Sequence, residues 1–325
     1  MFMDKSKLLS YDNYIVAFSG GKDSTACYLH LLERGIPANS IEIWHQDIDG
    51  REGSELMDWP VTADYCRKFA EHFGSPIYYS WKVGGFEREM LRENALTAPT
   101  RFETPSGEVK QVGGTSGKLS TRRMFPQVSA NLSVRWCSSY LKIDVCSTAI
   151  RNQNRFNDSK TLVLSGERAE ESAARAKYNE FEPDRSDNRS GRKARHVDRW
   201  RAVLSWSEKE VWDIIERWQL RVHPAYYLGW GRTSCVACIF GSCNQWASLF
   251  KIMPDKLIQI AEYEEDFGKT IHRKESVIDR AIGGTPYDMD VDMVAVAKNK
   301  KYTLDIEIKN WVLPSGAFGE SCGPT

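Results

Sequence analysis

The fold of this chain is decided by the stretch Tyr14-Ile-Val-Ala-Phe-Ser-Gly-Gly-Lys-Asp-Ser-Thr25. Residues 14–18 are apolar and partly β-branched, which predicts a buried strand, and the pattern from Thr25 to Gly35 predicts a helix. A Gly-rich turn followed by a helix N-terminus presents unpaired N–H groups and the positive end of the helix dipole. The stretch therefore predicts an anion-binding corner, in which Gly20 and Gly21 permit close approach. Further donors there are Lys22, Ser19 and Ser24.

The spacing in this corner differs from that of a Walker A loop and from that of a dinucleotide-binding G-x-G-x-x-G. The hexapeptide Ser19-Gly-Gly-Lys-Asp-Ser24 instead resembles, letter for letter, the PP-loop of the ATP pyrophosphatase superfamily. The resemblance implies that the chain binds ATP and cleaves it between the α- and β-phosphates, with Lys22, Asp23 and Mg²⁺ taking part. It also implies ATP contacts from Ser19, Gly20, Gly21, Lys22, Asp23 and Ser24. A Gly-rich turn with a chance lysine is the alternative.

The rest of the chain predicts an α/β fold with a doubly wound, mostly parallel sheet, because short apolar strands alternate with helical segments. We expect strands at 41–44, 77–79, 161–164 and 201–204, and helices at 62–73, 86–94, 207–218 and 245–267. With 325 residues, one large domain and a smaller region are the natural division. We place a PP-loop domain in 1–220 and a helical C-terminal region in 221–325.

Charge and hydropathy limit the partners of this chain. Its 44 basic and 44 acidic residues balance, so nucleic acid would have to bind a local patch. No signal peptide and no apolar run of membrane-spanning length is visible in the sequence. We therefore expect a cytoplasmic protein without a membrane partner, which fits its eight cysteines if these serve metal or sulfur chemistry rather than disulfides.

Two further strand ends carry candidate ligand contacts. Polar residues at the carboxyl ends of parallel strands lie at the ligand crevice, so Trp44 and Asp47 are candidates for the adenosine contact that the superfamily makes there. Turn formation before Gly50 is the alternative for Asp47. The segment from Gly166 to Ser172 resembles the second anion-contacting segment of phosphoadenosine phosphosulfate reductase-like proteins, which implies ATP contact by Gly166 and a catalytic Arg168. An ordinary ion pair of Arg168 with Glu170 or Glu171 is the alternative.

Two polar segments interrupt the α/β pattern. Residues 97–133 are rich in Gly, Ser, Thr and Pro, which is typical of either a functional lid or a solvated insertion. Residues 183–201 are rich in arginine and read as a loop, which could contact the phosphates of DNA. A solvated charge run is the alternative for this second segment.

Four cysteines are candidate metal ligands: Cys137, Cys235, Cys238 and Cys243. Cys235 and Cys238 form a Cys-x-x-Cys, and four thiolates suit either an iron–sulfur cluster or tetrahedral zinc. Cys137 follows an Arg-Trp pair that resembles the Arg-Trp-Cys stretch of phosphoadenosine phosphosulfate reductase-like proteins, and the resemblance favours iron. Ser138 occupies the place of a second cysteine that those reductases use, and buried, unliganded thiols are the alternative.

The chain ends with Glu320-Ser-Cys322, flanked by Gly and Pro, which predicts a mobile tail. Sulfonucleotide reductases present a nucleophilic cysteine on such a tail, within Glu-Cys-Gly-x-His. Here Ser321 separates the Glu from Cys322 and no His follows. Cys322 is therefore either a catalytic thiol or an idle one.

The Arg-Trp-Cys and Cys-x-x-Cys arrangement resembles the sulfur-modification branch of the superfamily, which includes DndC-like DNA phosphorothioation proteins. The resemblance implies an ATP pyrophosphatase that activates an acceptor, the DNA backbone or a sulfur carrier, for sulfur insertion. An SspA- or IscS-like cysteine desulfurase would then supply the sulfur. One alternative is a thiol-dependent reductase of adenylyl sulfate or phosphoadenylyl sulfate. The other is a non-catalytic, nucleotide-gated scaffold for a desulfurase.

Overall fold

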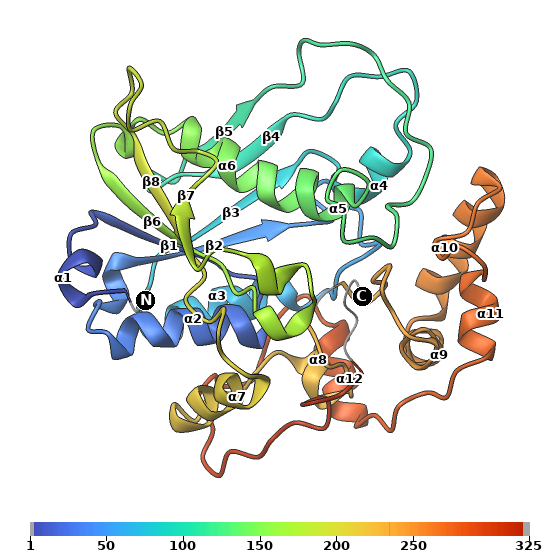
Figure 1. Ribbon diagram of the computed structural model, residues 1–325. Coiled ribbons are helices and arrows are strands. Elements are labelled where there is room, and N and C mark those ends of the chain that lie inside the picture. The colour runs from blue at the N-terminus through green and yellow to red at the C-terminus, as the bar shows by residue number, and fades with distance from the viewer. Residues whose placement is uncertain (1–2, 234, 321–325) are drawn as a thin grey trace.

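A single eight-stranded sheet forms the centre of the protein in the computed structural model, which describes residues 3–233 and 235–320 (Figure 1). The strand order is β5-β4-β3-β2-β1-β6-β8-β7. The five inner strands are parallel, whereas β4, β5 and β7 pair antiparallel at the edges. The strands are β1 (Asn13–Ala17), β2 (Ile41–Asp47), β3 (Ile77–Lys82), β4 (Thr100–Glu103), β5 (Val109–Val112), β6 (Lys160–Leu164), β7 (Phe181–Pro183) and β8 (His196–Trp200). The predicted doubly wound, mostly parallel sheet is confirmed.

Helices cover both faces of this sheet. Figure 1 shows α2 and α3 on one face and α5 and α6 on the other. A π-helical turn, Ser139–Ile143, joins α5 to α6. The helices are α1 (Lys5–Leu8), α2 (Lys22–Glu33), α3 (Thr62–Phe73), α4 (Gly85–Met90), α5 (Trp136–Ser138), α6 (Asp144–Arg151), α7 (Glu208–Arg217), α8 (Pro224–Tyr227), α9 (Cys243–Ile252), α10 (Pro254–Phe267), α11 (Val277–Ile282) and α12 (Val291–Lys298).

The ends of the helices follow the local sequence. Helix α2 starts directly after Gly21, its N-cap, and the chain leaves it at Gly35, whose φ of +88° favours glycine. Helix α7 starts with a capping box, in which Ser207 and Glu210 each accept a backbone N–H of the other. These contacts explain why the predicted helices at 25–35 and 207–218 are present.

The core has two layers, because neighbouring residues of a strand point to opposite faces of the sheet. The larger layer lies on the α2 and α3 side and includes Val16, Phe18 and Phe69. The smaller layer lies on the α6 side and includes Ile15 and Trp44. Both layers exclude water from the sheet, so polar groups that approach the ligand crevice do so at the strand ends.

Two polar segments are more ordered than the sequence predicts. Within the 97–133 insertion, β4 and β5 form an antiparallel pair that extends the sheet beyond β3. In the arginine-rich segment, β7 and β8 pair with each other and β8 pairs with β6. The predicted last strand at 201–204 is wrong, because the strand ends at Trp200 and Leu204 closes a turn by donating to the Arg201 carbonyl.

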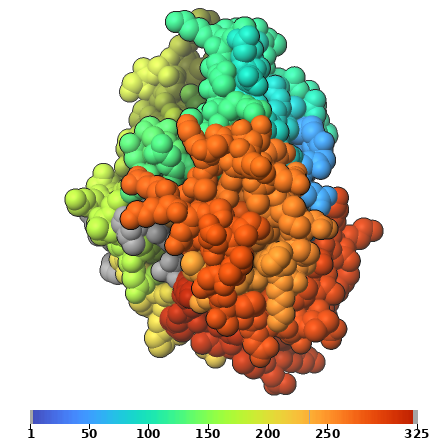
Figure 2. Space-filling view, turned by 90° about the vertical axis from the view of Figure 1, so that its right-hand side faces the viewer, coloured from blue at the N-terminus to red at the C-terminus, as the bar shows by residue number. Residues whose placement is uncertain are grey.

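The C-terminal region begins after α7 and packs against the sheet domain. The predicted boundary at residue 220 falls between α7 and α8, and one hydrophobic cluster continues across it from Met3 to Ile306. Figure 2 shows α9 to α11 in orange, spread over one face between the insertion and the last part of the chain. Among the described residues, no helix has the length and apolar character needed to cross a membrane.

Candidate functional site

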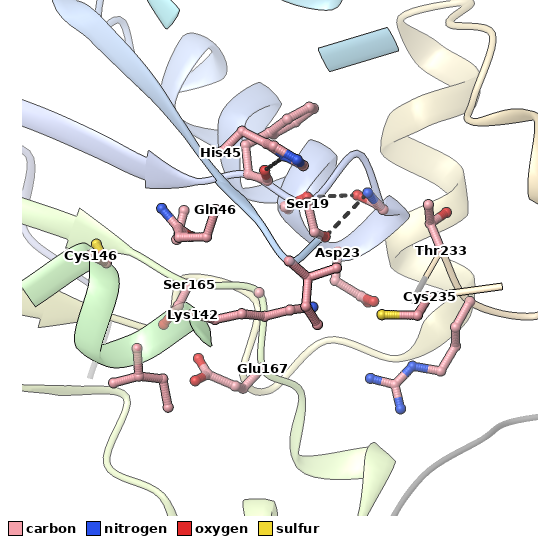
Figure 3. Close-up of a pocket in the computed structure, with 18 of the residues that line it drawn as sticks. Ser19, Asp23, His45, Gln46, Lys142, Cys146, Ser165, Glu167, Thr233 and Cys235 are labelled. Atoms are coloured by element: carbon pink, nitrogen blue, oxygen red, sulfur yellow. Dashed lines mark hydrogen bonds between the residues drawn. The ribbon is translucent and has the colours of Figure 1, made fainter. Parts of the chain in front are cut away.

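A cavity of about 280 Å³ lies at the carboxyl ends of the central strands. Strand β1 lies between β2 and β6, so the chain leaves β1 toward one side of the sheet and returns on the other. In open α/β sheets, ligands bind where the strand order reverses in this way. The cavity is lined by residues near the ends of β1, β2 and β6 and by four residues of the C-terminal region, Tyr226, Arg232, Thr233 and Cys235 (Figure 3).

The loop between β1 and α2, Ser19–Ser24, forms one wall of this cavity. Gly20 has a φ of +78°, which a residue with a side chain rarely adopts. The backbone N–H groups of Asp23 and Ser24 lie in the first turn of α2, where a helix supplies no acceptor, and no other described residue accepts from them. Of the predicted ATP contacts in this loop, those lining the cavity are Ser19, Gly21, Asp23 and Ser24. The loop therefore offers an anion two backbone N–H donors, whereas the Ser24 hydroxyl donates to the Gly21 carbonyl at 2.9 Å.

Lys22 is buried behind the loop rather than in the cavity. Its ammonium nitrogen lies 2.9 Å from the Gly231 carbonyl oxygen and 3.2 Å from a carboxylate oxygen of Glu208. Burial alone would lower the pKa of Lys22, but the neighbouring charges, Asp23 first among them, raise it overall. Lys22 is thus a charged side chain that ties α2 to α7 and to the C-terminal region in this structure.

Tyr226 contributes a functional group that the sequence analysis did not single out. It lies on α8, and its hydroxyl oxygen accepts the backbone N–H of Lys22 at 2.9 Å and that of Thr233 at 3.4 Å. Because both bonds use the oxygen as acceptor, the hydroxyl proton stays available, and no described residue accepts it. Tyr226 lines the cavity, so this proton can be donated to a ligand there. The segment His223-Pro-Ala-Tyr226 was the available signal for this residue.

Asp23 and Arg168 form a buried ion pair beside the loop. The Arg168 Nε donates to Asp23 Oδ1 at 2.6 Å, and a second nitrogen of the guanidinium pairs with Glu170. Although burial opposes its charge, Lys22 and Arg168 hold the pKa of Asp23 below its ordinary value. Arg168 is 4% exposed and does not line the cavity. In this structure Arg168 holds Asp23 in place, and its predicted contact with a ligand stays a prediction.

Gly166, in the loop after β6, packs directly against the loop after β1. A Cβ atom on Gly166 would lie 2.8 Å from the Asp23 carbonyl carbon and 2.9 Å from the Ser24 nitrogen. Real Cβ contacts essentially never fall below 3.0 Å. Only glycine fits this position without a shift of the anion-binding loop. The structure thus brings Gly166, predicted as an ATP contact, to the wall of the cavity.

Residues at the end of β2 differ from the predicted contacts. Trp44 is 2% exposed and packs in the smaller core layer, with its ring edge against Phe156. Asp47 faces Arg51, at 3.6 Å, rather than the cavity. Trp44 and Asp47, the predicted adenosine contacts, therefore do not line the cavity, whereas their neighbours His45 and Gln46 do.

Four basic residues, which the sequence analysis missed, line the cavity together with Glu167 and Glu171. Lys142, from the π-helical turn, lies across the cavity from Asp23 (Figure 3). Arg199 extends from β8 and pairs with Asp184 at 2.6 Å. The remaining two cations, Arg175 and Arg232, both pair with Glu171. These residues come from four separate segments, so spacing in the sequence gives no sign that they meet.

The candidate cysteines divide into two groups. Cys137, Cys235 and Cys238 line a second cavity beside the first, whereas Cys243 starts α9 and lies outside it. Within residues 3–233 and 235–320, no three Cys, His, Asp or Glu side chains are arranged to hold a metal ion. The predicted four-cysteine set is therefore not assembled here, and these thiols as placed do not fit an iron–sulfur cluster or zinc.

The arginine-rich segment is largely neutralised by nearby carboxylates. Arg189 pairs with Asp187 and Asp198, Arg199 pairs with Asp184, and Arg185 pairs with Asp144. Paired arginines make a weaker phosphate-binding surface than their number in the sequence indicates. Contact with DNA through 183–201 stays a prediction.

The predicted catalytic Cys322 lies outside the described residues. The chain that leads to it is held at Glu320, whose carboxylate accepts hydrogen bonds from Ser242, Asn244 and Tyr287. The Glu320 carbonyl also packs so closely on Gly231 that a Cβ there would lie 2.9 Å from it. The Gly231 carbonyl accepts a hydrogen bond from the Lys22 ammonium, so the described end of the chain borders the site.

Comparison with known proteins agrees with this arrangement. The phosphoadenosine phosphosulfate reductase domain family matches residues 116–240, a region that runs from the insertion through β6 to the Cys-x-x-Cys. The chain is also 27% identical, over 262 residues, to an uncharacterized 37.8 kDa protein in the gpa 5' region of Escherichia phage 186. That similarity covers 77% of this chain and 74% of the phage protein.

The family match indicates a general class of chemistry. A phosphoadenosine phosphosulfate reductase domain supports nucleotide-related sulfur chemistry and suggests an enzyme that acts on nucleotides. The parallel sheet and the glycine-rich corner at its centre agree with that match. Residues 116–240 are thus similar to a phosphoadenosine phosphosulfate reductase domain.

Proposed function

We propose that this protein is an ATP pyrophosphatase, which transfers the AMP moiety of ATP to an acceptor and releases pyrophosphate. Sulfur, or water in its absence, then displaces AMP from the activated acceptor. The observation that carries the proposal is the pair of unused N–H groups of Asp23 and Ser24, which face a cavity at the reversal point of the sheet. Such donors at a helix N-terminus bind phosphate oxygens. The acceptor that the superfamily resemblance implies is the DNA backbone or a sulfur carrier, with a cysteine desulfurase as the sulfur source.

The residues of the cavity take distinct parts in this reaction. The β1–α2 loop binds the leaving pyrophosphate through its N–H groups, and the Tyr226 hydroxyl donates to one of its oxygens. On the opposite wall, Lys142 and Arg175 offset the negative charge that develops as the bond to the α-phosphate breaks. Donors fixed before the reaction stabilise the transition state without the reorganisation that water would need.

Mg²⁺ fits the cavity through the carboxylate of Asp23. Magnesium is usually held by one or two carboxylates together with phosphate oxygens, and Asp23 lines the cavity with its charge maintained by Lys22 and Arg168. When bound, the ion neutralises phosphate charge.

The test is incubation of the purified protein with ATP and Mg²⁺, with separate measurement of pyrophosphate, AMP, ADP and phosphate. We expect pyrophosphate and AMP in equal amounts. Asp23→Asn should lower the rate by about 10²-fold or more, since it removes a buried charge from the loop. Lys68→Ala, a change on the exposed side of α3, should leave the rate unchanged. Release of ADP and phosphate instead would contradict the proposal.

A second candidate function is favoured by the anchored Glu320, which places the end of the described chain beside Gly231. It is a thiol-dependent reductase of adenylyl sulfate or phosphoadenylyl sulfate, with Cys322 as the nucleophile. With adenylyl sulfate or phosphoadenylyl sulfate and a dithiol reductant in place of ATP, such a reductase forms an S-sulfonate on Cys322, from which the dithiol releases sulfite. Cys322→Ser should release none. An ATP pyrophosphatase would keep its pyrophosphate release in Cys322→Ser, so this one variant separates the two functions.

A further inference from the structure

Glu167, the residue after Gly166, brings a carboxylate without hydrogen bonds to the wall of the candidate nucleotide cavity (Figure 3). Its side chain is 25% exposed, and its Oε2 atom is buried without a hydrogen-bond partner. Among the described residues, none donates a hydrogen bond to either oxygen of this carboxylate. Removing a carboxylate from water is costly unless donors complete its bonding, so Glu167 is placed to accept hydrogen bonds from a ligand.

The place of Glu167 in the cavity corresponds to the sugar of a bound nucleotide. The flat, apolar base fits the part of the cavity that Ala17, Ile143 and Val163 line. The phosphates bind at the start of α2, against which Gly166 packs. The segment from Val163 to Glu167 therefore runs from the base to the phosphates, along the ribose that joins them.

The charges of the cavity balance without a further phosphate group. Its described lining contains four basic and four acidic side chains. The basic ones are Lys142, Arg175, Arg199 and Arg232, and the acidic ones are Asp23, Asp58, Glu167 and Glu171. A triphosphate brings Mg²⁺ to offset its own charge. A phosphate on the ribose would instead meet the carboxylate of Glu167.

Arg201 is the cation beside Glu167 that could otherwise hold a phosphate on the ribose. It is 8% exposed and does not line the cavity. Its guanidinium pairs with two carboxylates, that of Glu167 at 3.5 Å and that of Glu182 at 2.8 Å. Two negative charges thus face one positive charge, so Arg201 does not make this corner attractive to an anion.

We propose that Glu167 recognises the ribose hydroxyls of the nucleotide and excludes nucleotides that carry a phosphate on the ribose. In dinucleotide-binding folds, a carboxylate accepts a hydrogen bond from the ribose in this way. The two oxygens of Glu167 can accept both neighbouring O–H groups, whereas a 3′-phosphate would bring like charges together. The substrate is then a nucleotide such as ATP or adenylyl sulfate rather than phosphoadenylyl sulfate. This inference rests on the proposed nucleotide site and specifies which nucleotide that site accepts.

The test is calorimetric titration of the full chain, at constant ionic strength, with three nucleotides that contain no bond between two phosphates. They are AMP, 2′-deoxy-AMP and adenosine 3′,5′-bisphosphate. We expect AMP to bind about fivefold to tenfold more tightly than 2′-deoxy-AMP, because the deoxy sugar loses a hydrogen bond to a charged group. AMP should also bind about tenfold or more tightly than the bisphosphate, because the 3′-phosphate meets a like charge.

Glu167→Gln separates recognition from packing, because glutamine keeps the shape of the side chain and removes its charge. This variant should bind the bisphosphate about fivefold more tightly than the wild type does, since Arg201 is then left with one carboxylate. A damaged fold cannot produce such a gain. Glu182→Gln is the matched control, because it removes the other carboxylate partner of Arg201, which does not line the cavity. It should keep the wild-type preference for AMP.

The proposal is wrong if the wild-type chain binds adenosine 3′,5′-bisphosphate or 2′-deoxy-AMP as tightly as AMP. It is also wrong if Glu167→Gln, shown to be folded by circular dichroism, keeps the wild-type ratio of AMP to bisphosphate affinity. A chain that shows the expected preferences but releases no pyrophosphate from ATP would refute the proposed function and leave this inference standing. Absence of binding by all three nucleotides would overturn both.

Discussion

Replacing Gly166 by alanine tests whether the loop after β6 sets the position of the anion-binding loop. The new Cβ would lie 2.8 Å from the Asp23 carbonyl carbon, and ordinary contacts begin near 3.4 Å. The two loops would therefore have to separate by about 0.6 Å. The atoms in the way are backbone atoms of the first turn of α2, so rotation of a side chain cannot relieve the contact.

Two effects of Gly166→Ala follow from this displacement. Overpacking of this kind costs about 1–3 kcal/mol of unfolding free energy, which should lower Tm by several degrees. The N–H groups of Asp23 and Ser24 would also move relative to the rest of the cavity. Because errors of this size in a binding geometry weaken each hydrogen bond, we expect ATP affinity to fall about tenfold, or about 1.4 kcal/mol.

Calorimetric titration with ATP and Mg²⁺, together with thermal melts, measures both effects. Gly74→Ala is the control for stability alone, because Gly74 ends α3 with a φ of +71° and a Cβ there would meet nothing within 4 Å. It should lower Tm by a similar amount through backbone strain while ATP binding stays unchanged. If Gly166→Ala folds and binds ATP as tightly as the wild type, the reasoning about this contact is wrong.

Two other changes test the electrostatics and the donors of the site. Tyr226→Phe removes the hydroxyl proton that faces the cavity, so ATP affinity measured by titration should fall about fivefold to tenfold, and an unchanged affinity would exclude Tyr226 as a ligand donor. Burial and the charge of Asp58 raise the pKa of Asp47 to about 7, so the folded chain keeps a proton that the unfolded chain releases, and stability should fall as pH rises from about 4 to about 7. In denaturant titrations at pH 8, the free energy of unfolding of Asp47→Asn should therefore exceed that of the wild type by about 1–4 kcal/mol. This difference should shrink at pH 5. An equal difference at both pH values would contradict the raised pKa of Asp47.

The parts of the site that the sequence predicts are those held within one short segment. The β1–α2 corner follows from glycine spacing, an apolar strand and a helical pattern, all within twelve residues. Gly166 was also predicted, because the segment from Gly166 to Ser172 resembles a known anion-contacting segment and follows an apolar strand. Each of these features depends on local backbone geometry, which adjacent residues determine.

The remaining contacts depend on tertiary packing that local patterns do not encode. Tyr226 accepts the N–H of Lys22 across 204 positions of sequence, and the segment His223-Pro-Ala-Tyr226 does not by itself show that the two residues meet. Trp44 and His45 point to opposite faces of β2, and the short apolar run before them does not show which face is the core. The sequence of β8 predicts a charged loop, because the hydrogen-bond partner that lets Asp198 be buried lies far away in the sequence. The Tyr11 hydroxyl donates to Asp198 at 2.6 Å.

The position of β1 between β2 and β6 has a consequence for synthesis of the chain. One side of β1 pairs with β2 as soon as residue 47 has been made, but the other side waits for β6, which starts at Lys160. Until then the most apolar strand of the nascent sheet presents an open edge, and such edges recruit strands from other chains. Fragments that stop before β6 should therefore aggregate, whereas the complete sheet covers this edge with its own later half.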